Sequence, residues 1–397
     1  MTLDFAKSDR SSVGVEWELQ LVDMDSNDLR QAADAVIGTA WENPTLKPHV
    51  HREMLLNTVE ITSGAHHRVG DCLQDLRTAV EGLRPLTNDL RIDVASAGSH
   101  PFARPAFQRV TDSVRYAELV ERTQYWGRQM LLYGVHVHVG VENRDKVLPL
   151  MNGLMTRAGQ LQALAASSPY WSGQDTGYAS NRAMMFQQLP TSGVPRLFDH
   201  WSELESYTDD VLKAKIIDSF DQIRWDMRPA PHLGTVEIRV FDACTNIREV
   251  NAMASLSHAM VEHCSTLLDA GETLPTLPDW YITENKWRSA RYGLDARLIV
   301  DKDGTEQYAR DTIEEMVSEL RPTAKQLDCE DGLDIVGEIL QGGASYQRQR
   351  DVAKAAPKNP LDAVVGLLRA EMHADRMLSA EEFLDGPWAV DSLLGTR

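Results

Sequence analysis

The sequence is poor in cysteine and has no long hydrophobic run. Its 397 residues include four cysteines, Cys72, Cys244, Cys264 and Cys329, and no two have the C-x-x-C spacing of a zinc or redox site. We therefore expect free or buried thiols in a reducing compartment. No apolar run approaches the ~18 residues that a membrane span needs, and the polar first ten residues lack the apolar core of a secretory signal. These features predict a cytoplasmic protein.

Positive charge is also scarce. The chain has 40 basic and 59 acidic side chains, a net charge of −19, which argues against broad binding to nucleic acids or anionic membranes. It does not exclude a small anionic substrate, because a local group of arginines or a metal ion reverses the field inside a pocket. The phosphate-binding patterns G-x-x-x-x-G-K-[ST] and G-x-G-x-x-G are absent. Metal ions and scattered basic side chains would therefore have to hold any nucleotide phosphates.

The stretch 14–21 alternates between apolar and polar residues, which predicts a half-buried strand. Its polar face carries two carboxylates, Glu16 and Glu18, spaced two residues apart, or roughly 7 Å along a strand. That spacing suits one hard cation or two neighbouring ones. Taken alone, the stretch is equally compatible with an ordinary solvent-facing strand.

Two further strands add complementary chemistry. The stretch 134–140 has valines on one face and His136 and His138 on the other, and the stretch 235–242 alternates Glu237 and Arg239 with aliphatic residues. Carboxylates combined with an imidazole suit Mg²⁺, Mn²⁺ or Zn²⁺. The guanidinium of Arg239 suits phosphate or carboxylate. Individually, these residues are also compatible with a core histidine or a cross-strand ion pair, but three such strands together predict a metal-binding floor.

A second acidic pair, Glu53 and Glu60, has an odd separation. A continuous strand would therefore place the two side chains on opposite faces. Glu60 lies between Val59 and Ile61 in a strand-like alternation. Glu53 reaches the same site only if the backbone bends between the two, near Asn57.

The predicted architecture is α+β. The strands are apolar on one face only, unlike buried parallel strands, and long helical segments separate them. We expect an antiparallel sheet with helices on its apolar face and its other face open. The chain is predicted to form one catalytic domain over 1–397, with strands mostly within 10–245 and a largely helical part from about 246. Helices are predicted over 29–41, 67–90, 113–130, 145–167, 197–219 and 246–268, and a small hairpin is predicted around Gly304.

Basic residues in the loops are candidates for binding ATP or substrate. The segment 345–350 could also open a helix whose N-terminus helps to hold an anion. Each of these side chains is equally compatible with a solvated surface position. The candidates, together with His138, are Arg182, Lys286, Arg288, Arg291, Arg348 and Arg350.

Three segments resemble the type 2 glutamate–cysteine ligase family, also called carboxylate–amine ligases. They are Gly-Val-Glu-Trp-Glu at 14–18, Gly-Val-His-Val-His-Val-Gly at 134–140 and Thr-Val-Glu-Ile-Arg-Val-Phe-Asp at 235–242. The segments 285–296 and 343–350 are also similar to that family, so the resemblance runs almost to the C-terminus. It implies a glutamine-synthetase-like catalytic domain, with a curved, mainly antiparallel sheet, helices on its convex face and the active site on its concave face.

The resemblance also implies Mg²⁺ (or Mn²⁺) with ATP as co-substrate. The implied reaction joins the γ-carboxylate of L-glutamate to the amine of L-cysteine. ATP converts the carboxylate, a poor electrophile, into an acyl phosphate that an amine can attack, while cations and Arg239 neutralise the developing charge. Some members of the family perform the step with cysteine poorly. The implied metal ligands are Glu16, Glu18, Glu53, Glu60, His136 and Glu237.

Two other functions stay open at this point. One is a metal-dependent amidohydrolase, because H-x-H also occurs on strands of barrel hydrolases, although one-sided strands and a glutamate-rich floor argue against it. The other is a non-catalytic relative that binds nucleotide or metal. No Ser–His–Asp or Cys–His arrangement indicates a side-chain nucleophile. The expected partners are ATP and small amino acids, without nucleic acid or membrane, and a homo-oligomer stays open.

Overall fold

A seven-stranded sheet forms the centre of the computed structural model, which describes residues 3–388. Six strands follow the order β10-β11-β5-β1-β3-β2, and β4 pairs with β1 beyond the end of β5. Every pair in this sheet is antiparallel, which confirms the predicted α+β class. The strands are β1 (Val13–Asp23), β2 (Val50–Arg52), β3 (Thr58–Thr62), β4 (Ile92–Ala95), β5 (Gly134–Gly140), β10 (Met227–Ala230) and β11 (Thr235–Asp242).

The alternation in β1 sets the two faces of the sheet. Val15, Trp17 and Leu19 are fully buried on one face, and Glu16 and Glu18 lie on the other. The Trp17 indole donates hydrogen bonds to the Ser96 hydroxyl at 3.0 Å and to a main-chain carbonyl at 3.1 Å. Its polar group is therefore satisfied inside the core.

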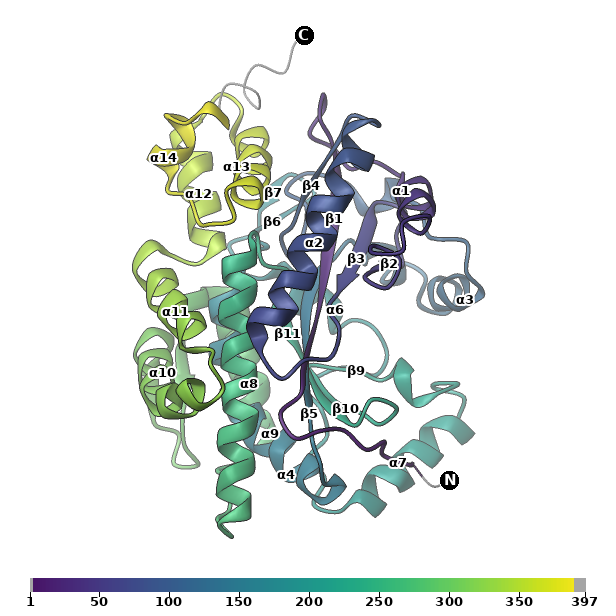
Figure 1. Cartoon of the computed structure of the whole chain (residues 1–397). Helices are drawn as coiled ribbons and strands as arrows, with labels where there is room; N and C mark the ends of the chain where they lie inside the picture. The colour runs from purple at the N-terminus through teal and green to yellow at the C-terminus, as the bar shows by residue number, and fades with distance from the viewer. Residues whose placement is uncertain (1–2, 389–397) are drawn as a thin grey trace.

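Helices cover the sheet and extend it into further layers. Helix α2 (Val69–Asn88) contacts β1, β3 and β4, and the long α8 (Ile247–Asp269) contacts β5 and α2; Figure 1 shows these two helices running alongside the strands. Helix α5 (Ala158–Ala165) packs on β11, and α13 (Pro360–Ala374) packs on β4. Asn246 caps α8 by accepting the Glu249 main-chain N–H at 3.0 Å.

The remaining helices lie around this centre. After β11, the described chain is helical apart from one hairpin, and Figure 1 shows α10, α11 and α12 beside or above α8. The hairpin predicted around Gly304 is confirmed as β12 (Arg297–Ile299) with β13 (Glu306–Tyr308). Two more small sheets are β6 (Tyr170–Trp171) with β7 (Gln174–Asp175), and β8 (Ser192–Gly193) with β9 (Arg224–Trp225). The helices are α1 (Ala33–Ala40), α3 (Val114–Thr123), α4 (Val147–Leu154), α6 (Asn181–Phe186), α7 (Trp201–Lys213), α9 (Asp279–Tyr292), α10 (Ala309–Gln326), α11 (Glu330–Gly342), α12 (Ser345–Ala355) and α14 (Ala380–Leu384).

Several predicted helices are shorter than expected; 29–41 is α-helical only over Ala33–Ala40, and 197–219 only over Trp201–Lys213. The segment 145–167 forms α4 and α5, separated by a 3₁₀ turn at which the Thr156 hydroxyl donates to the Gly153 carbonyl at 2.6 Å. Such a side-chain bond competes with the regular helical pattern. The segment 113–130 is α-helical only to Thr123, because Gln124 adopts a φ of 47° and ends the helix.

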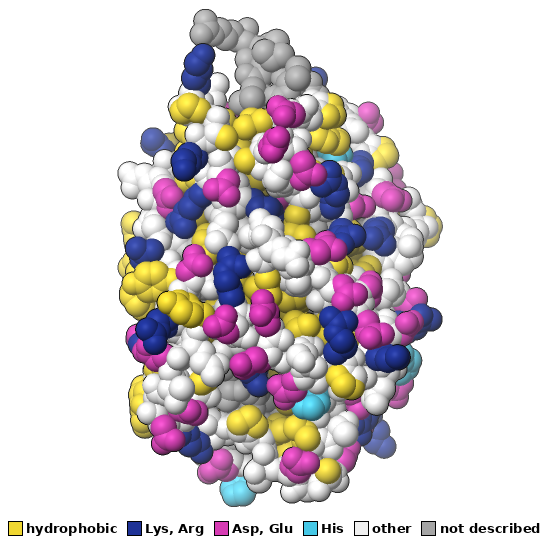
Figure 2. Space-filling model, turned by 90° about the vertical axis from the view of Figure 1, so that its left-hand side faces the viewer, with side chains coloured by type: hydrophobic (Ala, Val, Ile, Leu, Met, Phe, Trp, Pro, Cys, Tyr) yellow, Lys and Arg dark blue, Asp and Glu magenta, His cyan; other side chains and the backbone are white. Residues whose placement is uncertain are grey.

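One large hydrophobic core runs from β1 to α13, and a small second cluster lies among α12, α13 and α14. On the face shown in Figure 2, acidic and basic side chains are interspersed without a broad patch of one sign. Among the helices of residues 3–388, none is both long and apolar enough to cross a membrane.

Candidate active site

Polar side chains from four neighbouring strands, β3, β1, β5 and β11, meet on the open face of the sheet. Because the strands are antiparallel and in register, residues far apart in the sequence become direct neighbours. Several of them line a cavity of about 310 Å³. The cross-strand neighbours are Glu18 with Glu60, Glu16 with His136, and His138 with Glu237.

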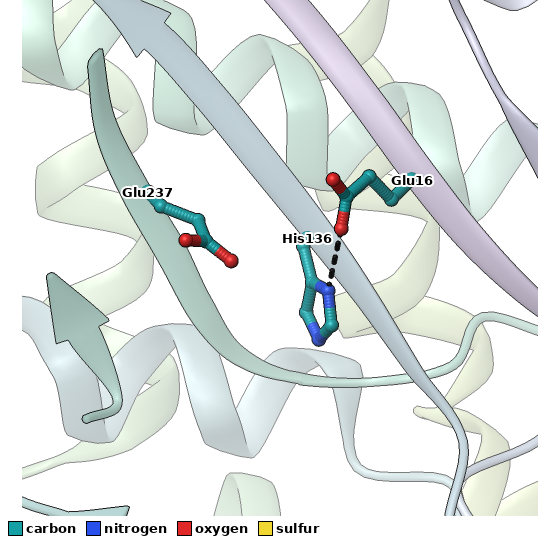
Figure 3. A group of neighbouring side chains, drawn as sticks. All are labelled: Glu16, His136 and Glu237. Atoms are coloured by element: carbon teal, nitrogen blue, oxygen red, sulfur yellow. Dashed lines mark hydrogen bonds and ion pairs between the residues drawn. The ribbon is translucent and has the colours of Figure 1, made fainter. Parts of the chain in front are cut away.

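The first acidic group consists of Glu16, His136 and Glu237, whose ligand atoms lie within 4.8 Å of one another. His136 Nδ1 lies 2.9 Å from a carboxylate oxygen of Glu16 (Figure 3). Burial lowers the pKa of His136 to about 4, with a contribution from the charge of Arg239. The imidazole is therefore neutral at pH 7, donates from Nδ1 to Glu16 and keeps a lone pair on Nε2. Burial opposes ionisation of Glu16, but hydrogen bonds from His136 and His138 hold its pKa well below the usual value.

The second acidic group consists of Glu18, Glu53 and Glu60, again with ligand atoms within 4.8 Å of one another. Burial raises the pKa of Glu18 to about 8, and the neighbouring charge of Glu53 adds to this effect. The same two causes raise the pKa of Glu60 well above its usual value. Three crowded carboxylates resist ionisation unless a cation joins them, and an all-oxygen donor set fits a hard divalent ion.

Glu53 reaches this group because the backbone reverses direction after β2. Strands β2 and β3 are antiparallel neighbours, and residues 53–57 form the connection between them. Asn57, where the sequence analysis placed the required bend, lies in this turn. Its amide oxygen accepts the Tyr133 hydroxyl at 2.9 Å, and its amide nitrogen donates to Gln108 at 2.7 Å.

Two arginines share the carboxylate of Glu237. Arg228 Nε donates to one oxygen at 2.5 Å, and Arg239 Nη1 donates to the other. Glu237 is only 1% exposed. Burial alone would raise the pKa of Glu237, but the charges of Arg239, His138 and Arg228 hold it well below the usual value. Glu237 is therefore ionised, and Arg228 and Arg239 both line the cavity.

Arg182 is the most unusual cation of the cavity. It is 5% exposed, and no carboxylate of the described residues lies within ion-pair distance of its guanidinium. Its Nη1 donates to the Arg239 carbonyl at 3.2 Å, and Nη2 lies 3.5 Å from His136 Nε2. A Cβ at Gly134 would lie 2.4 Å from Nη2, so the glycine opens the space that Arg182 occupies.

The structure does not bring five of the predicted basic residues to the cavity wall. Each has another partner, and a role of any of them in binding ATP or substrate stays a prediction. Lys286 pairs with buried Asp226, Arg288 with Glu284 and Glu306, Arg350 with Asp175, Arg291 with the Gly177 carbonyl and two tyrosine rings, and Arg348 with Glu249 and Glu371. His138 lies beside the cavity, with Nε2 at 3.3 Å from Glu16 and Nδ1 at 3.0 Å from the Thr235 hydroxyl.

Arg228 and the apolar part of the wall were not predicted from the sequence. Arg228 lies on β10, a four-residue strand that contains Pro229. What marks Arg228 as a site residue is its position opposite Glu237 in the strand register, which the structure reveals. The apolar residues come from helices and loops that carry no motif. They are Met54, Leu119, Met130, Leu132, Phe186 and Leu189, with Tyr116, Asp221 and Arg224 beside them.

Comparisons with known proteins show to which family the chain is similar. The sequence profile described as glutamate–cysteine ligase family 2 matches residues 12–365. Relatives from Mycobacterium bovis and Mycobacterium tuberculosis, provisionally named glutamate–cysteine ligase 2, are 50% identical over 370 residues, which cover 93% of this chain and 97% of each relative. A relative from Mycobacterium ulcerans with the same name is 50% identical over 93% of both chains.

Two solved structures share the fold. A glutamate–cysteine ligase from Francisella tularensis, in complex with AMP, has a TM-score of 0.63 at 13% identity, over 97% of this chain and 99% of that chain. A bifunctional glutathione synthetase from Pasteurella multocida has a TM-score of 0.61 at 16% identity, over 91% of this chain and 51% of that chain. The profile and the close relatives, which span most of the sequence, confirm the resemblance: the chain belongs to the glutamate–cysteine ligase family 2, a family of ATP-dependent ligases.

Proposed function

We propose that this protein uses ATP to join the γ-carboxylate of L-glutamate to the amine of L-cysteine, through an acyl phosphate. The observation that carries the proposal is the pairing of two acidic groups with four arginines around one cavity. The acidic groups are Glu16, His136 and Glu237, and Glu18, Glu53 and Glu60; the arginines are Arg182, Arg224, Arg228 and Arg239.

The two acidic groups fit divalent cations, and we propose Mg²⁺, or Mn²⁺ in its place. The donors of the second group are all carboxylates, which suit a hard ion, and the single imidazole of the first group is neutral, with a lone pair on Nε2 that faces Arg182 Nη2 at 3.5 Å. Bound cations would neutralise phosphate charge and orient the phosphates. The high pKa values of Glu18 and Glu60 support this fit, because burial and the charge of Glu53 outweigh the attraction of the nearby arginines.

The arginines of the cavity suit the anionic parts of the reactants. Arg239 is placed to donate to the phosphoryl group as charge develops on its oxygens, because its guanidinium already lies beside Glu237 at the cavity wall. Arg182, buried and without a carboxylate partner among the described residues, suits a carboxylate or phosphate of a bound reactant. The apolar wall formed by Leu119, Leu132 and Phe186 would limit access of water to the acyl phosphate.

We further propose that the chain acts as one catalytic unit in the cytoplasm, with small-molecule partners. The single large core that joins β1 to α13 supports one unit. We also propose that the protein self-associates into a homo-oligomer, which sedimentation or light scattering would measure.

The direct test is an assay for ADP and phosphate release with Mg·ATP, L-glutamate and a panel of amines that includes L-cysteine, with the product identified by mass spectrometry. We expect release that requires both glutamate and an amine. Hydrolysis of an amide without ATP would instead favour the metal-dependent hydrolase. ATP binding without turnover on any amine would favour the non-catalytic relative.

Two variants link the activity to the acidic groups. Glu16→Gln and Glu237→Gln should each lower turnover by about 100-fold or more, because each removes a metal ligand, and this loss should be larger than any loss of thermal stability. Glu315→Gln, on an exposed position of α10, is the matched control and should keep full activity. Normal turnover in both site variants would contradict the metal-binding model.

A further inference from the structure

The geometry points to Lys286 as a positioning residue for Arg239. We propose that Lys286 acts through Asp226 and does not touch the reactants itself. The inference rests on the proposed function, in which Arg239 contacts the transferred phosphoryl group. It changes the role expected for Lys286, which the sequence suggests as a direct ligand of ATP or substrate.

Arg239 lies in an irregular part of β11. The register of β11 with β5 shifts between Ile238 and Phe241, which marks a bulge at residues 239–240. Bulges redirect side chains but remove the regular ladder bonds that would hold the backbone. The main chain of Arg239 is instead held on both sides by other elements. Its N–H donates to the Asp226 carbonyl at 2.8 Å, and its carbonyl accepts from Arg182 at 3.2 Å.

Asp226 lies between β9 and β10 and connects three parts of the site. Its N–H donates to the Gly193 carbonyl at 2.8 Å, so it also fixes the loop that follows α6. Its carboxylate accepts two hydrogen bonds from Lys286 Nζ, each of 2.7 Å. Arg224, two residues earlier in the chain, and Arg239, whose N–H binds the Asp226 carbonyl, both line the cavity. A shift of Asp226 would therefore move Arg239 and part of the wall together.

Lys286 is anchored on the opposite side, in α9. Lys286 and Asp226 are 6% and 8% exposed, and the Lys286 carbonyl accepts from the Gln162 amide at 2.7 Å. Buried ion pairs contribute little net stability, because desolvation offsets most of the attraction. They do define a single geometry, since each buried charge has one partner. The Lys286–Asp226 pair therefore fixes where Asp226, and with it the Arg239 backbone, lies relative to α9.

Direct binding of a reactant by Lys286 disagrees with its environment. Nζ directs two of its three N–H donors to the carboxylate of Asp226, and Lys286 does not line the cavity, whereas Arg182 does. A positioning residue affects kcat more than KM, because ground-state contacts persist while the group that meets the transition state is displaced.

The experiment compares Lys286→Met, Lys286→Arg and the double variant Lys286→Met/Asp226→Leu with wild type. Lys286→Met should lower kcat by about 100-fold, the scale of an approximately 1 Å displacement of a catalytic group, with KM values for ATP and glutamate unchanged within about twofold. Lys286→Arg should have a kcat at least about tenfold higher than that of Lys286→Met, because the guanidinium can still bind Asp226. The double variant replaces the pair by apolar side chains, so it should regain the melting temperature but not kcat.

Arg297→Met is the matched control, because Arg297 lies on β12, which packs against α9, and forms an exposed ion pair with Glu306 away from the cavity; its kinetics should equal those of wild type. Wild-type kcat in Lys286→Met would overturn the proposal. So would a rise in KM for ATP at constant kcat, which indicates direct contact, or recovery of kcat in the double variant, which indicates a purely structural role. Wild-type protein without amine-dependent ADP release would refute the proposed function itself, before any variant is compared.

Discussion

Glu18 lies directly opposite Glu60 across β1 and β3, with Glu53 within reach of both. Like charges in direct cross-strand register destabilise a sheet. The protein keeps three carboxylates here although Gln, Thr or Ser would fit a strand better. Burial, with the charge of Glu53 in addition, raises the pKa of Glu18 and of Glu60, and a proton or a cation relieves the crowding.

Removal of one of these charges should stabilise the metal-free protein. Glu18→Gln is expected to raise the free energy of unfolding in EDTA at pH 8 by about 1–2 kcal/mol, the usual range when strain at a functional site is removed, while ligase activity is lost. Chemical denaturation of both proteins, followed by the ADP assay, checks the two effects.

Glu315→Gln again serves as the control and should leave both quantities unchanged. Added Mg²⁺ should stabilise the wild-type protein more than Glu18→Gln, because only the wild type has the full donor set. Equal or lower stability of the metal-free Glu18→Gln variant would contradict the interpretation of the second acidic group.

The same groups predict how stability depends on pH without metal. The pKa of Glu18 rises from 4.5, the usual value, to about 8 in the folded protein. Between these two pH values the folded state binds more protons than the unfolded state. The contribution of Glu18 to the free energy of unfolding is therefore fully present below pH 4.5 and is lost as pH rises toward 8. Unfolding free energies in EDTA at pH 5, 6, 7 and 8 should fall more steeply for wild type than for Glu18→Gln. Parallel pH profiles would show that Glu18 is already ionised.

Arg239→Lys separates geometry from charge. A lysine retains the positive charge but not the planar fork, so it cannot donate to Glu237 and to a phosphoryl oxygen in the same way. We expect an intact fold and a kcat lower by about 100-fold or more, as for a lost donor to developing charge. Arg248→Lys is the control, because Arg248 pairs with the exposed Glu338 away from the cavity. Unchanged kinetics in Arg239→Lys would assign Arg239 to a structural ion pair.

The contribution of Asp93 to the free energy of unfolding should depend on pH in the opposite direction to that of Glu18. It lies on β4 and binds Arg369 at 2.8 Å and His373 at 2.9 Å, both on α13. Burial alone would raise the pKa of Asp93, but the His373 hydrogen bond and the charges of His373 and Arg369 lower it from 3.8. Its contribution is therefore present above pH 3.8 and is lost as pH falls through the lower folded-state value.

Asp93→Asn should cost about 3 kcal/mol of unfolding free energy at pH 7, as when one partner of a buried pair is removed. The difference from wild type should shrink toward pH 3, and urea denaturation at both pH values measures it. A difference that is constant over this range would mean that the carboxylate charge is not what holds α13 to the sheet.

The strands that form the floor of the site could be predicted because each carries its own alternation of apolar and polar residues. Val15, Trp17 and Leu19 alternate with carboxylates, and this period alone places Glu16 and Glu18 on one face. Strand β10 could not be predicted in the same way, since it has four residues and one is Pro229. The lengths of the helices depended on single side-chain bonds, such as that of Thr156 to the Gly153 carbonyl.

The basic residues show where sequence reasoning stops. Arg348 lies 99 positions from Glu249, and Lys286 lies 60 positions from Asp226. No local pattern reveals such partners, so a buried structural arginine and a ligand-binding arginine look the same in the sequence. Arg182 was distinguished only when the structure left its guanidinium without a carboxylate among the described residues.

Arg348 also determines how the chain can be divided. Its guanidinium, 3% exposed, binds Glu249 on α8 and Glu371 on α13, and Glu371 also accepts the Leu378 main-chain N–H. A chain shortened before Glu371 would leave a buried charge with half of its compensation. The C-terminal helices are therefore part of the same folding unit as the sheet. A gene split between α11 and α12 should yield two fragments that fold only together.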